Sequence, residues 1–210
     1  MRMFKTPRLI RFVHKRITWG FSISEPTVYL TFDDGPNPNI TPWILDELKK
    51  HDFKATFFCV GENVERYPEL YSRILHEGHA VGNHTMKHEN GLKVSTEKYL
   101  ESIGEARQFI DSTLFRPPYG KITPALVRKI KKEYRIILWS WLSYDYDAAV
   151  SIDKILQKAN RIQAGDILVL HDNQKIVERQ KELLPKLISL LKAKKLKSNS
   201  LNGIFFSDIN

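Results

Sequence analysis

The chain has 210 residues, of which 42% are hydrophobic and 11% aromatic, as is typical of a globular protein with a core of its own. It has one cysteine, Cys59, which excludes an intrachain disulfide. The net charge of +9 would suit anionic partners, but a solvated basic face explains it better, and no nucleic-acid-binding motif accompanies it, so we expect no nucleic-acid partner.

The first 26 residues are rich in basic side chains and contain no apolar run long enough for a signal peptide or a transmembrane helix. Residues 4–13 mix apolar and basic side chains, which suits weak contact with a membrane surface and suits packing on the protein equally well. We expect residues 1–26 to be an extension packed on one domain of residues 27–210. By default we expect a monomer that is cytoplasmic or peripheral to a membrane.

Short β-rich runs alternate with helical patterns along the rest of the chain. Strands are predicted at residues 27–32, 54–60, 79–82, 114–116, 135–141, 166–170 and 203–206, and several are continuously apolar, as in parallel strands buried on both faces. Helices are predicted between most of them, over residues 68–77 and 174–194 and after the caps Thr41, Ser95, Thr123 and Ser151. The lysine-rich residues 192–200 have a disordered composition.

The repeated order of a strand followed by a helix predicts an α/β fold, either an open doubly wound sheet or a barrel. Ionisable side chains stand at or just beyond the carboxyl ends of successive predicted strands: Asp33, Asp34, His84, Arg116, Asp145 and His171. Barrel enzymes build their active sites at these strand ends. The pattern therefore favours a distorted (β/α) barrel with about seven parallel strands.

Two adjacent aspartates, Asp33 and Asp34, end the first predicted strand. Neighbouring carboxylates repel each other, so the pair is costly unless a cation or a cationic side chain is near. Further along, His84 and His88 form an HxxxH arrangement. One Asp with two His is a common metal-binding set that leaves positions open for water, and the second Asp is then free to act as a base. The pattern indicates metal-assisted hydrolysis.

Taken in order, the motifs resemble those of the NodB-homology polysaccharide deacetylases, a carbohydrate esterase family. The resemblance runs from about Val28 to the C-terminus and rests on TFDDG at 31–35, HTMKH at 84–88, RPPYG at 116–120 and ILVLHD at 167–172. One motif departs. Where the family has Asp-x-x-Asp-Trp, residues 142–146 read LSYDY, which keeps Asp145 but has Leu142 and Tyr146 at the other two positions.

The resemblance implies a metal site and a base. Asp34, His84 and His88 are expected to hold one divalent metal, with zinc best suited to the ligands and cobalt, nickel or manganese also compatible. Asp33 is expected to be the general base, with Arg116 as the ion-pair partner that orients it.

The resemblance also implies an acid and a substrate pocket. His171 is expected to protonate the leaving amine, with its imidazole held by Asp145. The backbone N–H of Tyr119 is expected to face the oxyanion, while its ring lines the sugar groove. The apolar pocket for the acetyl methyl group is expected to consist of Tyr146, Leu168 and Val169.

These roles predict a hydrolase that removes N-acetyl groups from the amino sugars of an acetylated glycan, either peptidoglycan or a chitin-like polymer. Retention of His171 favours amide hydrolysis, because an amine leaves only when it is protonated. Two alternatives stay open. One is an O-acetyl esterase acting on xylan-type glycans. The other is a carbohydrate-binding protein whose catalysis is impaired by the departures at Leu142 and Tyr146.

Overall fold

Strands and helices alternate along most of the chain in the computed structural model, which describes residues 2–7, 10 and 16–202. The strands are β1 (Thr27–Asp33), β2 (Ala55–Cys59), β3 (Ala80–Asn83), β4 (Leu114–Phe115), β5 (Arg135–Ile136), β6 (Trp141–Leu142), β7 (Ile167–His171) and β8 (Lys197–Ser198). The helices are α2 (Thr41–Lys50), α3 (Gly61–Arg66), α4 (Pro68–His76), α5 (Thr96–Arg107), α6 (Pro124–Ile130), α7 (Ile152–Ala159) and α8 (Val177–Ala193), with 3-10 turns η1 (Pro118–Gly120) and η2 (Gln174–Ile176).

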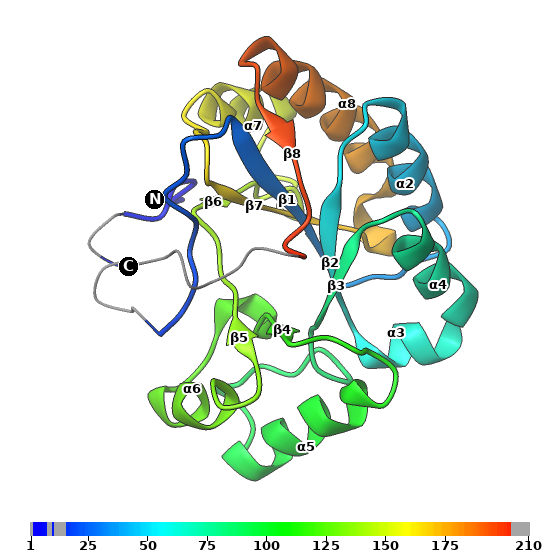
Figure 1. The fold of residues 1–210 in the computed structure, drawn as a ribbon, viewed down its shortest axis with the longest axis vertical. Coiled ribbons are helices and arrows are strands. Elements are labelled where there is room, and N and C mark those ends of the chain that lie inside the picture. The colour runs from blue at the N-terminus through cyan, green and yellow to red at the C-terminus, as the bar shows by residue number, and fades with distance from the viewer. Residues whose placement is uncertain (1, 8–9, 11–15, 203–210) are drawn as a thin grey trace.

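The sheet has the strand order β5-β4-β3-β2-β1-β7-β6, with β8 paired to the start of β1. Its pairings are parallel, and the sheet curls with the helices around its outside (Figure 1). Among the described residues, the outer strands β5 and β6 do not pair with each other, so the barrel stays open on that side. The predicted distorted (β/α) barrel is confirmed.

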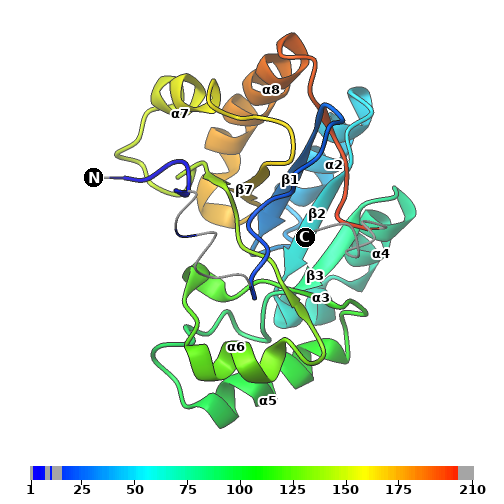
Figure 2. The same ribbon diagram turned by 60° about the vertical axis from the view of Figure 1, so that its left-hand side comes forward.

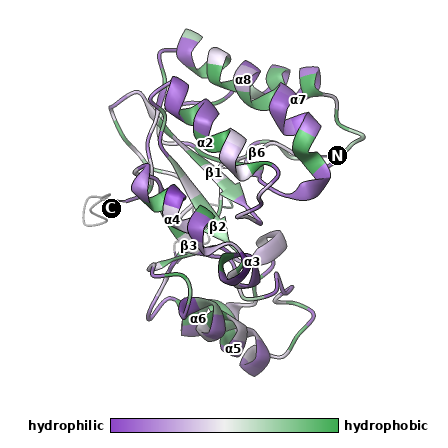
Figure 3. Cartoon of the chain, turned by 90° about the vertical axis from the view of Figure 1, so that its right-hand side faces the viewer, coloured by the Kyte–Doolittle hydropathy of each residue, from purple (hydrophilic) through white to green (hydrophobic). Residues whose placement is uncertain are grey.

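Alternation along the two central strands separates the core from the site. On β1, Leu30 and Phe32 join the large apolar cluster beneath the helices, while Asp33 faces the pocket described below. On β7, Leu168 belongs to the same cluster, and Val169 lies on the opposite face of the sheet. The helices that cover the cluster carry both hydrophobic and hydrophilic residues (Figure 3).

Helix starts followed the predicted caps at three of four positions. The hydroxyls of Ser95, Thr123 and Ser151 each accept a backbone N–H of the following first turn, which confirms their role. The prediction for Thr41 is wrong: Ile40 precedes the helix, and Thr41 is its first residue. The Thr41 hydroxyl instead donates to the Asp172 carboxylate at 2.6 Å, so it contributes to the region of the site.

The predicted strand at residues 135–141 is two short strands, because its backbone changes partners along its length. Ile137 N–H bonds to Phe115 of β4, Leu138 N–H bonds to Thr18, and Ser140 N–H bonds to Ile167 of β7. The chain thus crosses from one edge of the sheet to the other. The short helix α3 and the turn η1 were not predicted.

The predicted disorder at residues 192–200 is wrong. Leu196 and Leu201 are buried, and β8 pairs with β1 between them, so apolar anchors fix a segment whose composition is mostly polar. The predicted strand at 203–206 lies outside the described residues.

The described part of residues 1–26 contacts both edges of the open sheet. Lys5 forms an antiparallel bridge with Trp141, Thr18 a parallel bridge with Ile137, and Gly20 an antiparallel bridge with Asp166. The domain boundary at residue 26 stays a prediction. Within the described residues, none of the helices combines the length and the apolar character needed to cross a membrane.

We expect Leu168→Ala to lower the free energy of unfolding by about 2–5 kcal/mol, because Leu168 is fully buried in the large cluster. Urea unfolding measures the change. The control is Leu75→Ala on α4, where the side chain is 43% exposed and we expect a change of about 0.5 kcal/mol or less. Equal losses in the two variants would contradict the assignment of Leu168 to the core.

Candidate active site

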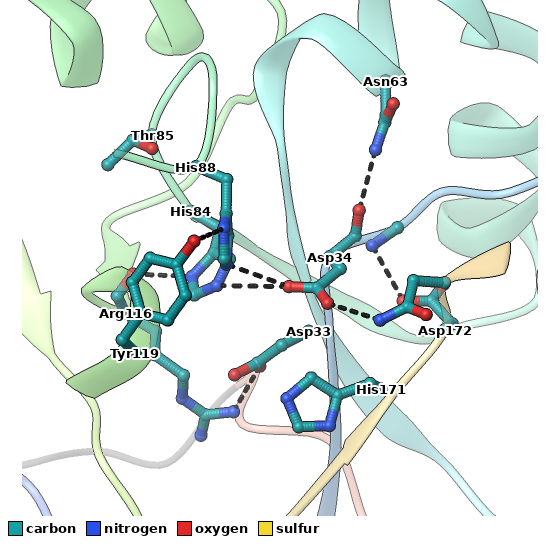
Figure 4. Close-up of polar contacts among 12 residues, drawn as sticks. Asp33, Asp34, Asn63, His84, Thr85, His88, Arg116, Tyr119, His171 and Asp172 are labelled. Carbon is teal, nitrogen blue, oxygen red and sulfur yellow. Dashed lines mark hydrogen bonds and ion pairs between the residues drawn. The ribbon is translucent and has the colours of Figure 1, made fainter. Parts of the chain in front are cut away.

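A pocket of about 720 Å³ opens at the carboxyl ends of the strands. Its walls come from the ends of β1, β6 and β7, from helix α3 and turn η2, from the loops that follow β1, β3, β4 and β6, and from the connection between β5 and β6. It is lined by Asp33, Asp34, Asn37, Asn63, His84, His88, Tyr119, Gly120, Trp139, Leu142, Tyr146, Val169, His171, Asn173, Gln174 and Lys175. The predicted ionisable residues therefore meet in one place, with Arg116 bonded to Asp33 of the lining (Figure 4). Asp145 bonds to His171 of the lining.

Arg116 forms a buried ion pair with Asp33 beneath this pocket. The guanidinium has no exposed surface and donates to the Asp33 carboxylate at 2.6 Å and to the Thr31 hydroxyl at 2.6 Å. It also donates to two backbone carbonyls, those of Ile137 and Leu138, at 3.2 Å each. With so many acceptors around a rigid fork of donors, the pair has one geometry, which fixes the Asp33 carboxylate at the pocket floor.

His84 offers a neutral ring nitrogen to the pocket. Its Nδ1 lies 2.7 Å from the Arg116 carbonyl oxygen, which only accepts, so Nδ1 carries the proton and Nε2 has a free lone pair. Burial lowers the pKa of His84 to about 4, which keeps the ring neutral at pH 7. This Nε2 lies 3.8 Å from an oxygen of Asp34.

Asp34 is anchored through both its side chain and its backbone. Asn173 donates to the Asp34 carboxylate and Asn63 to its carbonyl, each at 2.8 Å. Burial alone would raise the pKa of Asp34, but the hydrogen bond from His88 and the nearby charge of His171 hold it well below its usual range. The carboxylate stays charged, and one of its oxygens lies 3.1 Å from His88 Nε2.

Asp34, His84 and His88 fit a divalent metal. Each offers one ligand atom, and the three atoms lie within 4.8 Å of one another. The ring of His84 is oriented by a backbone carbonyl and the carboxylate of Asp34 by an amide, as is usual for metal ligands. One carboxylate oxygen and two imidazole nitrogens suit zinc and neighbouring transition metals.

Backbone strain collects around this set. Asp34, His88 and Tyr119 have φ values of 86°, 58° and 61°, in the left-handed region that residues other than glycine rarely adopt. Such conformations cost free energy and persist only where the surroundings impose them, often at functional sites. Gly35, next to Asp34, is required for space: a Cβ there would lie 2.0 Å from an oxygen of Asp172.

His171 and Asp145 form the second charged pair. His171 Nδ1 donates to one Asp145 oxygen at 2.7 Å, and the His171 backbone N–H donates to the other at 2.8 Å. Burial alone would lower the pKa of His171, but the Asp145 carboxylate, with smaller contributions from Asp34 and Asp33, raises it to about 10. The imidazole is therefore protonated at neutral pH.

Aromatic and apolar side chains also line the pocket. The Tyr119 ring is 60% exposed and its hydroxyl lies 3.1 Å from His88 Nδ1, while the Tyr146 ring lies 5.1 Å from the His171 ring. Val169 and Leu142 line the pocket, but Leu168 does not. The expectation that Leu168 contacts the acetyl group is wrong, because adjacent residues on a strand face opposite sides and Leu168 packs in the core.

Sequence reasoning missed four polar residues that support the site: Asn63, Asn173, Asp172 and Gln180. Asp172 is fully buried and accepts from Gly35 N–H at 2.8 Å, and burial raises its pKa well above the usual range. Gln180 donates to the His171 carbonyl at 2.8 Å and to Asp145 at 3.4 Å. A signal for Gln180 exists: it occupies a position of the buried apolar stripe of α8, where a polar residue needs a partner.

Comparisons with known proteins agree on one family. A family model described as polysaccharide deacetylase matches residues 22–136. A peptidoglycan-N-acetylglucosamine deacetylase of Bacillus cereus is 38% identical over 164 residues, which cover 74% of this chain and 77% of that protein. A chitooligosaccharide deacetylase of a Bradyrhizobium species is 37% identical over 166 residues, 75% of each protein. The crystal structure of the Bc1960 peptidoglycan N-acetylglucosamine deacetylase, determined with a bound benzamide compound, is similar with a TM-score of 0.84, 32% identity, and coverage of 93% of this chain and 95% of that one.

The raised pKa of His171 makes the stability conferred by Asp145 depend on pH. A His whose pKa is higher in the folded state stabilises the protein fully below its unfolded pKa of about 6.5, and this contribution is lost as the pH rises through the folded value of about 10. We expect the difference in unfolding free energy between wild type and Asp145→Asn to shrink between pH 6.5 and pH 10, measured by urea unfolding.

The control for this prediction is Asp147→Asn. Asp147 lies in the same loop as Asp145, but its carboxylate pairs with Arg2 and makes no contact with His171. The difference between this variant and wild type should stay flat over the same range. A flat difference for Asp145→Asn as well would contradict the pairing.

Proposed function

The chain belongs to the polysaccharide deacetylase family, and we propose that it is a metal-dependent enzyme that removes N-acetyl groups from the amino sugars of a glycan of the peptidoglycan or chitin type. The observation that carries the proposal is the arrangement of two ion pairs, the buried Asp33–Arg116 and the partly buried His171–Asp145, at a pocket that also holds Asp34, His84 and His88. An amide needs a base for water and an acid for the amine, and the pairs supply one of each.

Asp34, His84 and His88 would hold the metal, whose chemistry when bound is to lower the pKa of water and to polarise the acyl carbonyl. Asp33 acts as the base that takes the proton of the attacking water. Arg116 binds one oxygen of the Asp33 carboxylate, so the carboxylate has a single orientation relative to the attacking water.

His171 acts as the acid. It carries a proton on each ring nitrogen at neutral pH, because Asp145 holds the Nδ1 proton and raises the pKa of the ring. The Nε2 proton is then available to the amine as the carbon–nitrogen bond breaks, and Asp145 stays in place to bind the neutral ring afterwards.

Tyr119 supplies the donor for the oxyanion. The Tyr119 backbone N–H donates to none of the residues that the structure describes. Tyr119 has a left-handed backbone conformation within the turn η1. An unpaired N–H is suited to the negative oxygen of the tetrahedral intermediate. The exposed rings of Tyr119 and Tyr146 offer flat surfaces for sugar rings, and Val169 with Leu142 offers an apolar contact for the acetyl methyl group.

Metal removal tests the proposal directly. We expect a chelator to abolish acetate release from an N-acetylglucosamine oligomer and added Zn²⁺ or Co²⁺ to restore it, measured by an acetate assay. His88→Ala is the control, since it should not be restored under the same conditions. Release that persists after verified metal removal would contradict metal dependence, and restored release from acetylated xylan alone would assign the pocket to O-acetyl esters.

We expect Asp33→Asn to reduce kcat by about 10²–10⁴-fold while the affinity for Zn²⁺ changes little, because the amide keeps the shape but cannot accept the proton. Isothermal titration with Zn²⁺ and acetate release together measure both effects. Asp52→Asn is the control: Asp52 has a φ of 53°, which asparagine tolerates, and it lies outside the pocket lining. Wild-type turnover in Asp33→Asn would exclude Asp33 as the base.

A further inference from the structure

A second concave site lies between the N-terminal segment and helix α7, apart from the pocket lining. It is a groove of about 440 Å³ lined by Arg2, Met3, Phe4, Lys5, Lys154, Lys158 and Arg161. Figures 2 and 3 both show the N-terminal end of the chain beside α7. Five of the seven lining residues are basic and none is acidic, so the groove has a strongly positive character.

Two of the five cations are neutralised within the protein. Arg2 pairs with Asp147 at 2.6 Å, and Lys5 pairs with Asp166 at 2.9 Å. Lys5 also donates to the carbonyl of Arg161, which ties the N-terminal segment to the end of α7. These pairs fix the walls of the groove and leave its remaining charges uncompensated.

The other three cations, Lys154, Lys158 and Arg161, make no ion pair or side-chain hydrogen bond within the part of the chain that the structure describes. Lys154 and Lys158 are four residues apart on α7, where like charges are neighbours and destabilise the helix. Arg161 adds a third charge to the same groove. An anion between them would remove this repulsion.

We propose that this groove binds the phosphate of an anionic phospholipid head group. Two ammonium groups and a planar guanidinium around one cavity suit a phosphate, whose oxygens accept several charge-assisted hydrogen bonds. Met3 is 49% exposed at the groove, beside the buried Phe4, so an apolar surface accompanies the charges. A phospholipid offers both a phosphate and an apolar portion, which a free phosphate does not. The inference is independent of the function proposed for the pocket.

The experiment is co-sedimentation of the full chain with vesicles of phosphatidylcholine alone and of phosphatidylcholine with phosphatidylglycerol. We expect binding only to the anionic vesicles and weakening with salt. The triple variant Lys154→Gln, Lys158→Gln, Arg161→Gln should bind about a hundredfold more weakly, since each cation at a membrane surface contributes about fivefold to partitioning.

The matched control is the triple variant Lys98→Gln, Arg128→Gln, Lys129→Gln. It removes two Lys and one Arg from exposed positions on α5 and α6, so the net charge falls by the same amount. We expect it to bind anionic vesicles nearly as the wild type does. None of the six residues lines the pocket, and all six are polar side chains of helices or their ends. Far-UV circular dichroism and urea unfolding should therefore be nearly unchanged in both variants, which checks that both are folded without relying on the activity of the pocket.

Three outcomes would overturn the proposal. The first is no binding of the wild type to anionic vesicles. The second is an equal loss in the two triple variants, which would mean that net charge alone drives binding. The third is binding of inorganic phosphate at the groove without any binding to vesicles, which would assign a soluble phosphate as the ligand. Phosphate binding would be detected by NMR, as shifts in the resonances of the N-terminal segment.

Discussion

The site depends on one buried residue, Arg116, through both of its ends. Its guanidinium holds the Asp33 carboxylate, and its backbone carbonyl accepts the Nδ1 proton of His84. The candidate base and one candidate ligand are thus set by the same residue at the end of β4. A buried arginine is costly unless its charge and its donors are satisfied. Here a carboxylate, a hydroxyl, two carbonyls and the face of Phe58, 4.0 Å from the guanidinium carbon, surround it.

This arrangement also resolves the repulsion between the adjacent aspartates. Asp33 and Asp34 point to different partners: Asp33 meets Arg116, and Asp34 meets two imidazoles and the amide of Asn173. The left-handed backbone at Asp34 turns its carboxylate away from the direction that strand alternation would give it. Both carboxylates therefore line the same pocket, where separate partners compensate their charges, and the hydrogen bonds around Asp34 hold the strained conformation.

Much of the fold and the charged part of the site could be predicted, because both rest on local signals. Apolar runs located the central strands, and side-chain caps located helices α5, α6 and α7. Strand ends on one edge of a parallel sheet then placed the ionisable residues together. The prediction that Leu168 lines the pocket was wrong, because a continuously apolar strand does not indicate which of its faces turns toward the core. The end of β5 after Ile136 was not predicted, because the backbone partners of the residues that follow it are distant in sequence.

The supporting residues were harder to predict because their partners come from distant parts of the chain. Asn173 contacts Asp34 across 139 positions, and Asn63 contacts the same residue across 29. Nothing in the sequence around either asparagine indicates these contacts. Gln180 is different, since its place in an apolar stripe already indicated a buried partner.

The departures at Leu142 and Tyr146 bear on catalysis through the contacts of Asp145. A missing carboxylate at 142 would matter most if it were needed to hold Asp145 or His171. Asp145 is instead held by the His171 backbone and ring and by Gln180, and Leu142 only lines the pocket. The Tyr146 ring lies 5.1 Å from the His171 ring in a T-shaped arrangement. The substitutions therefore alter the surface of the pocket while they leave His171, the candidate acid, and its partner Asp145 intact, which favours a catalyst with a changed groove over a binding protein.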